Sequence, residues 1–249
     1  ITAIEMSAFY KDIRDLLAVQ SIRYESEKYG PSNYSIYMNK DYGNVKGYTF
    51  SLTKRYDPVS RTSAFVDYTY QVTEGNSVTS GSFYYNALSG EQEEKRIVPL
   101  AWDQRHILNT NVSVGDPRNW NLGIISKLSS GWPYTPNIPD ANYVPQPNSG
   151  RKPWQWRVDM RLHKNFKIGK LNYLIFMKVY NLLDRRNERY VFNDTGRAGY
   201  TYVFQSTQET QGFKSHYGEP GVHEWSEYQV RPHYYTAPRS VNVGFSVDF

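Results

Sequence analysis

The alternation of apolar and polar side chains is the dominant pattern in this chain, and it is clearest at the end. From Val241 to Phe249, valine and phenylalanine alternate with asparagine, glycine, serine and aspartate, and an aromatic residue closes the run. A period of two places successive side chains on opposite faces of an extended chain. The pattern therefore predicts a β-strand with one apolar and one polar face.

Seven further segments alternate in the same way, and together they predict an all-β, antiparallel protein. We expect eight strands, near residues 2–10, 45–55, 62–72, 106–114, 120–128, 154–163, 171–182 and 241–249. The connections between them alternate between long and short. Outer-membrane barrels have short periplasmic turns and long extracellular loops, so the first strand is expected to start at the periplasm.

The long connections carry two specific expectations. Some thirty residues rich in Tyr, Ser, Asn and Gly separate the first two strands and are expected to form a loop. The segment from Gly131 to about Pro153 is rich in proline, which lacks the N–H that a strand ladder needs. We therefore expect no ladder strand there.

The strand at 154–163 separates its side chains most sharply. Its tryptophan and aliphatic residues share one face and its polar residues the other: Trp154, Trp156, Val158, Met160 and Leu162 against Gln155, Arg157, Asp159, Arg161 and His163. A soluble β-sandwich could place such polar side chains in water, so one strand alone does not distinguish a sandwich from a membrane barrel. The same separation of apolar and polar side chains recurs in most strands, and aromatic residues lie at the strand ends. Together these features favour a transmembrane β-barrel.

Composition agrees with a barrel. The mean hydropathy is −0.70, and the chain lacks the run of roughly 18 apolar residues that a transmembrane helix needs. The 23 tyrosines, 6 tryptophans and 11 phenylalanines suit the two bilayer–water boundaries, where a ring with a polar edge is satisfied. An aromatic-rich, soluble glycan-binding β-domain remains an alternative, and it predicts solubility without detergent.

No catalytic or cofactor chemistry is expected. The chain has no cysteine and no nucleophile elbow, metalloprotease helix or phosphate-binding loop, so we predict that it is not an enzyme. His216, His223 and His233 share one predicted loop, but their spacing matches no metal-ligand pattern and no metal is predicted. The net charge of +5 is spread along the chain, so no nucleic-acid partner is expected.

Four motifs resemble one family when they are taken together with their positions beside the strands. They are Asp103–His106, Gly131–Thr135, Val179–Asn187, and Pro238–Arg239 before a terminal strand that ends in phenylalanine. The set resembles the C-terminal barrel portion of TonB-dependent outer-membrane receptors, particularly those of Bacteroidota-type bacteria. The resemblance covers essentially the whole chain.

The resemblance implies a 22-stranded barrel filled by a plug domain. Residues 1–249 are then expected to be the C-terminal segment of that barrel, without the plug and the N-terminal strands. A self-closing eight-stranded barrel is the alternative. An open eight-stranded arc in lipid would leave two unpaired edges, each unsatisfied backbone group costing several kcal/mol, so other strands would have to complete it.

The resemblance also implies a function, a location and partners. The expected role is active uptake of a scarce nutrient (siderophore, cobalamin, oligosaccharide or peptide) across the outer membrane of a Gram-negative bacterium. The expected partners are membrane lipid, the protein's own plug and remaining strands, the TonB complex acting through the plug, the barrel-assembly machinery and a surface lipoprotein. The alternative is a scaffold barrel in a larger envelope complex.

Site residues are expected in three groups. Aromatic side chains of the external loops are the ligand-binding candidates: Trp132, Tyr134, Tyr202 and Trp225. Charged side chains of one strand are expected to face the lumen: Arg157, Asp159 and Arg161. The terminal strand resembles the assembly signal of such barrels through Phe245, Val247 and Phe249.

Overall fold

The chain folds into one large antiparallel β-sheet. The computed structural model describes residues 1–26, 28, 30–76, 96–137, 145–202 and 231–248. No α-helix occurs within these ranges, and a short 3-10 helix, η2 (Pro232–Tyr234), precedes the last strand. The expected all-β, antiparallel fold is confirmed.

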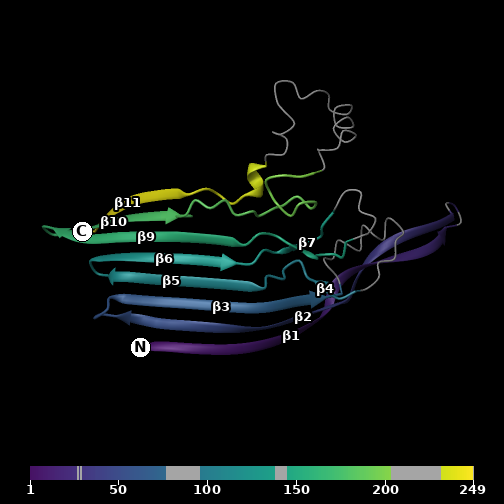
Figure 1. The fold of residues 1–249 in the computed structure, drawn as a ribbon, viewed down its shortest axis with the longest axis horizontal. Helices are drawn as coiled ribbons and strands as arrows, with labels where there is room; N and C mark the ends of the chain where they lie inside the picture. The colour runs from purple at the N-terminus through teal and green to yellow at the C-terminus, as the bar shows by residue number, and fades with distance from the viewer. Residues whose placement is uncertain (27, 29, 77–95, 138–144, 203–230, 249) are drawn as a thin grey trace, which may run out of the picture.

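Eight long strands lie side by side in the order in which they occur along the chain (Figure 1). They are β1 (Thr2–Ser26), β2 (Gly30–Asp57), β3 (Thr62–Gly75), β5 (His106–Asp116), β6 (Trp120–Ser129), β9 (Gln155–Ile168), β10 (Leu171–Tyr180) and β11 (Ser240–Asp248). A short strand, β4 (Val98–Pro99), pairs with the end of β3. All eight predicted strands are present, and most begin or end within two residues of the predicted positions.

The expected loop between the first two strands is wrong. β1 and β2 continue through that region as one long hairpin, paired as far as Ser26 and Gly30, with shifts of register between Ile13 and Leu17. The hairpin extends beyond the other strands in Figure 1. Polar residues occur on both of its faces, so the apolar–polar alternation that marks the other strands is weak here.

The expectation that the proline-rich segment contains no ladder strand is also wrong. β7 (Pro133–Tyr134) pairs with β8 (Gly150–Arg151) in a separate two-stranded sheet. Such a short pairing requires few ladder hydrogen bonds, so the missing N–H of Pro133 is tolerated.

Short and long connections lie at opposite ends of the sheet. The turns after Asp57, Asp116 and Ile168 lie at the end that also holds both chain termini, and the long connections lie at the other end (Figure 1). Gly169 adopts a φ of 62° in the two-residue turn between β9 and β10, a conformation that glycine takes without strain. The alternation of connection lengths read from the sequence is thus present, except that the first long connection is a hairpin.

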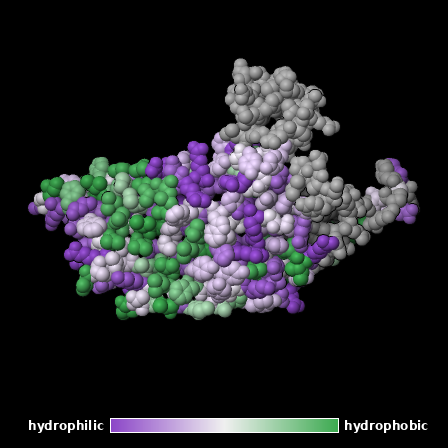
Figure 2. Space-filling model, in the orientation of Figure 1, coloured by the Kyte–Doolittle hydropathy of each residue, from purple (hydrophilic) through white to green (hydrophobic). Residues whose placement is uncertain are grey.

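The strand register sorts side chains onto two faces of opposite character. Ile4, Leu52 and Val66 lie in one row across β1, β2 and β3, and Val179 and Val241 are paired at the other edge. All of them belong to one face, which we call the apolar face. The face in view in Figure 2 is largely apolar over the half of the sheet nearer the short turns, with more polar surface toward the long connections.

Much of the apolar face is exposed in the described part of the chain, although Val158 and Val179 on the same face are buried. Met6 is 73% exposed, Val243 71% and Phe245 78%, although each alternates with polar neighbours on the opposite face. Buried apolar residues within the described ranges are few: Val98, Leu100, Val158, Val179, Val191 and Ala198. The sheet therefore presents a broad apolar surface and only a small core.

The described strands form an open sheet. β1 and β11 lie at the two ends of the strand order, and no pairing between them occurs within the described residues. The described residues therefore do not form the self-closed eight-stranded barrel that was the alternative. They form no closed barrel of any size.

Candidate ligand site on the polar face

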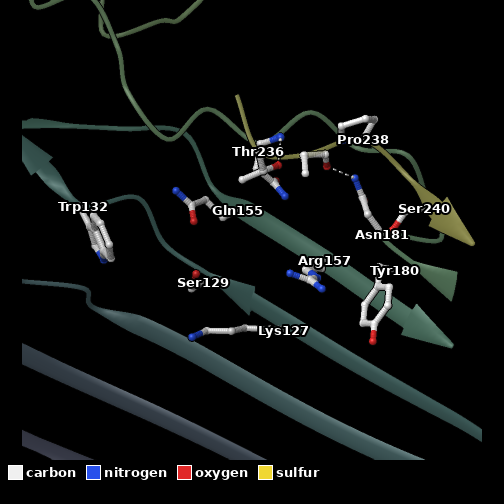
Figure 3. Close-up of a pocket in the computed structure, with 12 residues that line it drawn as sticks. Lys127, Ser129, Trp132, Gln155, Arg157, Tyr180, Asn181, Thr236, Pro238 and Ser240 are labelled. Atoms are coloured by element: carbon white, nitrogen blue, oxygen red, sulfur yellow. Dashed lines mark hydrogen bonds between the residues drawn. The ribbon is translucent and has the colours of Figure 1, made fainter. Parts of the chain in front are cut away.

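A hollow of about 500 Å³ opens on the polar face, at the end of the sheet that holds the long connections (Figure 3). It is lined by β6, β9, β10 and the segments beside them: Lys127, Ser129, Trp132, Gln155, Arg157, Tyr180, Asn181, Asn187, Thr236, Ala237, Pro238 and Ser240. Its volume lies within the range of about 300–1,000 Å³ that small-molecule sites occupy. Amide, hydroxyl, cationic and aromatic groups all face this space.

Asp159 orients the cation at the centre of the lining. Its Oδ1 accepts a hydrogen bond from Arg157 Nε at 2.9 Å and one from the backbone N–H of Asn181 at 2.8 Å. The guanidinium of Arg157 also lies 5.8 Å from the ring centroid of Tyr180, a distance at which a cation and an aromatic face attract each other. Arg157 is thus held in place from two sides.

Asn181 closes the end of β10 and connects it to the segment before β11. It is buried and adopts a φ of 53°, which asparagine tolerates better than most residues. Its side-chain amide donates to the carbonyls of Arg185 and Ala237, both at 3.1 Å, and its Oδ1 accepts from the N–H of Arg185 at 3.1 Å. The side chain of Asn181 therefore fixes both the turn after β10 and the segment that leads into β11.

Asn187 acts as a substitute strand partner for the start of β9. Its Oδ1 accepts from the N–H of Trp156 at 2.9 Å, and its Nδ2 donates to the carbonyl of the same residue at 2.9 Å. Its own N–H donates to Thr236 Oγ1 at 3.2 Å. The segments before and after the long final loop are joined at this residue.

A second buried polar side chain, that of Asp103, joins segments at the end of the sheet that holds the long connections. We call this end of the sheet the rim. Asp103 is 0% exposed and accepts hydrogen bonds from the backbone N–H of Thr73 at 2.8 Å and from Arg105 Nε at 3.3 Å. Arg151 of β8 also binds its carboxylate and its backbone carbonyl. Three segments that are distant in sequence meet at this carboxylate.

A further ion pair lies in the loop that follows β10. Glu188 accepts from Arg197 Nη2 at 2.7 Å and from the backbone N–H of Ala198 at 2.6 Å. The hydrogen bond to Glu188 raises the pKa of Arg197 above its ordinary value, so the pair stays charged. This loop is therefore ordered by its own polar contacts.

The four predicted ligand-binding aromatics have different positions. Trp132 lines the hollow. Tyr134 packs against Gly150 and Gly196, where burial, with a smaller effect of the Asp194 charge, raises the pKa of its hydroxyl. Tyr202 is exposed and contacts Tyr200, and Trp225 lies outside the described residues. Ligand binding by these residues stays a prediction.

The other predicted residues lie on opposite faces of the sheet where the structure describes them, and their roles at the lumen and in assembly stay predictions. Arg157, Asp159 and Arg161 share the polar face of β9, and only Arg157 lines the hollow. Phe245 and Val247 lie on the apolar face of β11, and Phe249 lies outside the described residues.

Two features are absent from the described residues. They contain no group of three or more His, Asp or Glu side chains placed to hold a metal ion. None of their helices is long and apolar enough to cross a membrane.

The sequence interpretation missed several residues of the hollow. The alternation assigned Gln155 to the polar face of its strand, but nothing in the pattern shows that it converges with Lys127 and Tyr180. Asn181 and Asn187 lie in a motif that the sequence does mark, and buried asparagines at a strand end are a recognisable signal for backbone capping.

A comparison of this chain with protein-family models, curated proteins and solved structures finds no match.

Proposed function

We propose that this chain forms part of the wall of a transmembrane β-barrel in the outer membrane of a Gram-negative bacterium, and that the barrel takes up a scarce nutrient. The observation that carries the proposal is the apolar face, which extends across the eight strands and leaves large apolar side chains such as Met6, Val243 and Phe245 exposed among the described residues. Monomeric soluble proteins rarely expose a continuous apolar surface of this extent.

An aromatic row lies at one end of the apolar face and an aromatic pair at the other. Tyr48, Tyr70, His106 and Trp154 form a continuous series toward the long connections, with ring centroids 5.4, 5.1 and 5.5 Å apart. At the other end, Phe166 stacks on Tyr173 with centroids 5.3 Å apart, close to the short turn between β9 and β10. Outer-membrane barrels carry such aromatic girdles at both bilayer–water boundaries.

The spacing of the aromatic groups leaves room for a bilayer. Trp154 of the row and Phe166 of the pair are twelve residues apart in sequence. At about 3.3 Å per residue they are about 40 Å apart along the strand, and a strand tilt of about 40° reduces this to about 30 Å along the barrel axis. The apolar band of outer-membrane barrels, about 25 Å high, fits between them.

The polar face then lines the lumen, and the hollow lies toward its outer mouth. This placement, together with the four sequence motifs, supports a receptor of the TonB-dependent type. Further strands at β1 and β11, a plug domain, the TonB complex, the barrel-assembly machinery and a surface lipoprotein are the partners that such a receptor would use.

Membrane fractionation tests the barrel. The complete protein is expected to stay in the outer-membrane fraction after carbonate extraction and to migrate differently on gels before and after heating. Recovery in the soluble fraction without detergent would contradict the proposal.

Growth on limiting nutrients tests the transport role. Deletion of the gene is expected to abolish growth on one member of a panel of siderophore-bound iron, cobalamin, oligosaccharide and peptide, and the wild-type gene is expected to restore it. Unchanged growth over the whole panel would favour a scaffold role.

A further inference from the structure

Two pairs of cationic side chains oppose each other across the polar face. The strand register places Lys127 of β6 opposite Arg157 of β9, and Arg161 of β9 opposite Lys178 of β10. Directly opposed residues in an antiparallel pair have Cβ atoms about 5 Å apart, and like charges in such positions destabilise the sheet. Two such pairs on one face call for a compensating group.

The described residues do not supply that group. On the polar faces of β6, β9 and β10 the cationic side chains are Lys127, Arg157, Arg161, Lys167 and Lys178, and the one carboxylate is that of Asp159. Asp159 accepts from Arg157, whereas Lys127 has no hydrogen bond or ion pair with any described residue. An excess of positive charge therefore faces the hollow.

The rest of the lining offers an aromatic ring and neutral polar groups. Trp132 lies at one side of the hollow (Figure 3) and is 43% exposed, so its ring offers an apolar surface to a ligand. Gln155, Thr236 and Ser240 add an amide and two hydroxyl groups, which pair with hydroxyl groups of a ligand. Aromatic surface, neutral polar groups and cations together match a ring that carries both hydroxyl groups and a carboxylate.

We propose that the hollow binds a carboxylate-bearing oligosaccharide, with a carboxylate between Lys127 and Arg157 and a sugar ring against Trp132. The inference rests on the proposed uptake role and names the substrate class of the same site. A carboxylate between the opposed cations removes their mutual repulsion, and its negative charge supplies Lys127 with a partner that the described residues do not provide.

Titration of the complete, detergent-solubilised protein tests the inference. Trigalacturonic acid is the probe, and calorimetry measures its Kd. Lys127→Gln is expected to raise the Kd roughly ten-fold or more, because one charge-assisted hydrogen bond is lost, and Lys127→Arg is expected to restore most of the affinity. Trp132→Leu is expected to weaken binding similarly, and higher salt is expected to weaken binding to the wild-type protein.

Lys11→Gln is the matched control. Lys11 is a lysine on the polar face of β1, away from the hollow, so its loss is expected to leave the Kd unchanged. Neutral maltotriose is expected to bind at least about ten-fold more weakly than trigalacturonic acid.

Three results would overturn the inference: no binding of trigalacturonic acid, binding that is unaffected by Lys127→Gln and Trp132→Leu, or equally tight binding of triglutamate, which carries carboxylates without sugar rings. These results are distinguishable from failure of the proposed function. A folded, membrane-extracted barrel that does not bind the probe contradicts only the ligand class, whereas a protein that is soluble without detergent contradicts the barrel itself.

Discussion

Buried polar side chains join distant backbone segments at the rim, the end of the sheet that holds the long connections. Asp103, Asn181 and Asn187 are almost fully buried, and each joins backbone segments that are far apart in sequence. The sequence motifs mark all three positions, but they do not reveal the partners. Thr73 is 30 residues from Asp103, and Trp156 is 31 residues from Asn187, so the pairing depends on the finished sheet.

Asp103→Asn is expected to lower the free energy of unfolding by about 3 kcal/mol, because two arginines lose a buried partner charge. The value lies at the lower end for buried pairs, since Arg105 and Arg151 are 40% and 30% exposed. Urea unfolding of the protein in lipid vesicles, followed by tryptophan fluorescence, measures the change.

The matched control is Asp12→Asn, which removes the carboxylate of an exposed pair with Arg14. Exposed pairs contribute about 0–1 kcal/mol, so little change is expected there. Equal effects of the two substitutions would show that Asp103 does not organise the rim.

Asn187→Ala is expected to expose the start of β9 locally. Both backbone groups of Trp156 lose their partner, and each unsatisfied buried group costs about 1–3 kcal/mol. Hydrogen exchange at the Trp156 amide is expected to accelerate, while the amides at the centre of β9 keep their protection. Asn165→Ala, at a half-buried site near the other end of β9, serves as the control. Unchanged exchange at Trp156 would contradict the assigned role of Asn187.

At the scale of the element, the alternation of apolar and polar residues with a period of two was the main signal that located the strands. A strand with one apolar face has one acceptable register, because a slip of one residue exchanges its faces, and such strands were found close to their predicted positions. The β1–β2 hairpin was missed because its outer part has no apolar face to mark it. β4, β7 and β8 have two residues each, which is too short for any periodicity to show.

Val243→Lys and Asn242→Lys test the two faces of β11 with the same introduced side chain. Val243 lies on the apolar face and Asn242 on the polar face. A lysine in the hydrocarbon centre of a bilayer costs about 2–4 kcal/mol, so Val243→Lys is expected to reduce the heat-modifiable, folded fraction sharply. Asn242→Lys is expected to fold normally. Equal folding of the two variants would contradict lipid contact at Val243.

Removal of Phe249 is expected to reduce the amount of assembled protein in outer-membrane fractions. The reason is the resemblance of the terminal aromatic strand to the signal that the barrel-assembly machinery reads. Quantitative blotting of unheated samples measures the folded form. Unchanged levels of heat-modifiable barrel would count against this role of the terminal residue.

At the scale of the whole molecule, the sheet has two faces that require different surroundings and two edges that require partners. The sequence predicts the faces, because each strand carries its own alternation. It does not determine closure, because closure depends on what pairs with β1 and β11, and those two strands do not pair with each other within the described residues. It also did not predict the hollow, whose lining comes from segments that meet only after the sheet has formed.

The most direct test of the central claim is a spin-label scan along β11. The chain has no cysteine, so single cysteines can be introduced at each position from Val241 to Ser246 without background labelling. In lipid vesicles, labels at 241, 243 and 245 are expected to be accessible to oxygen and protected from a water-soluble nickel complex, with the reverse at 242, 244 and 246. Access of the nickel complex at 241, 243 and 245, or protection of these sites from both reagents, would contradict a membrane-facing sheet.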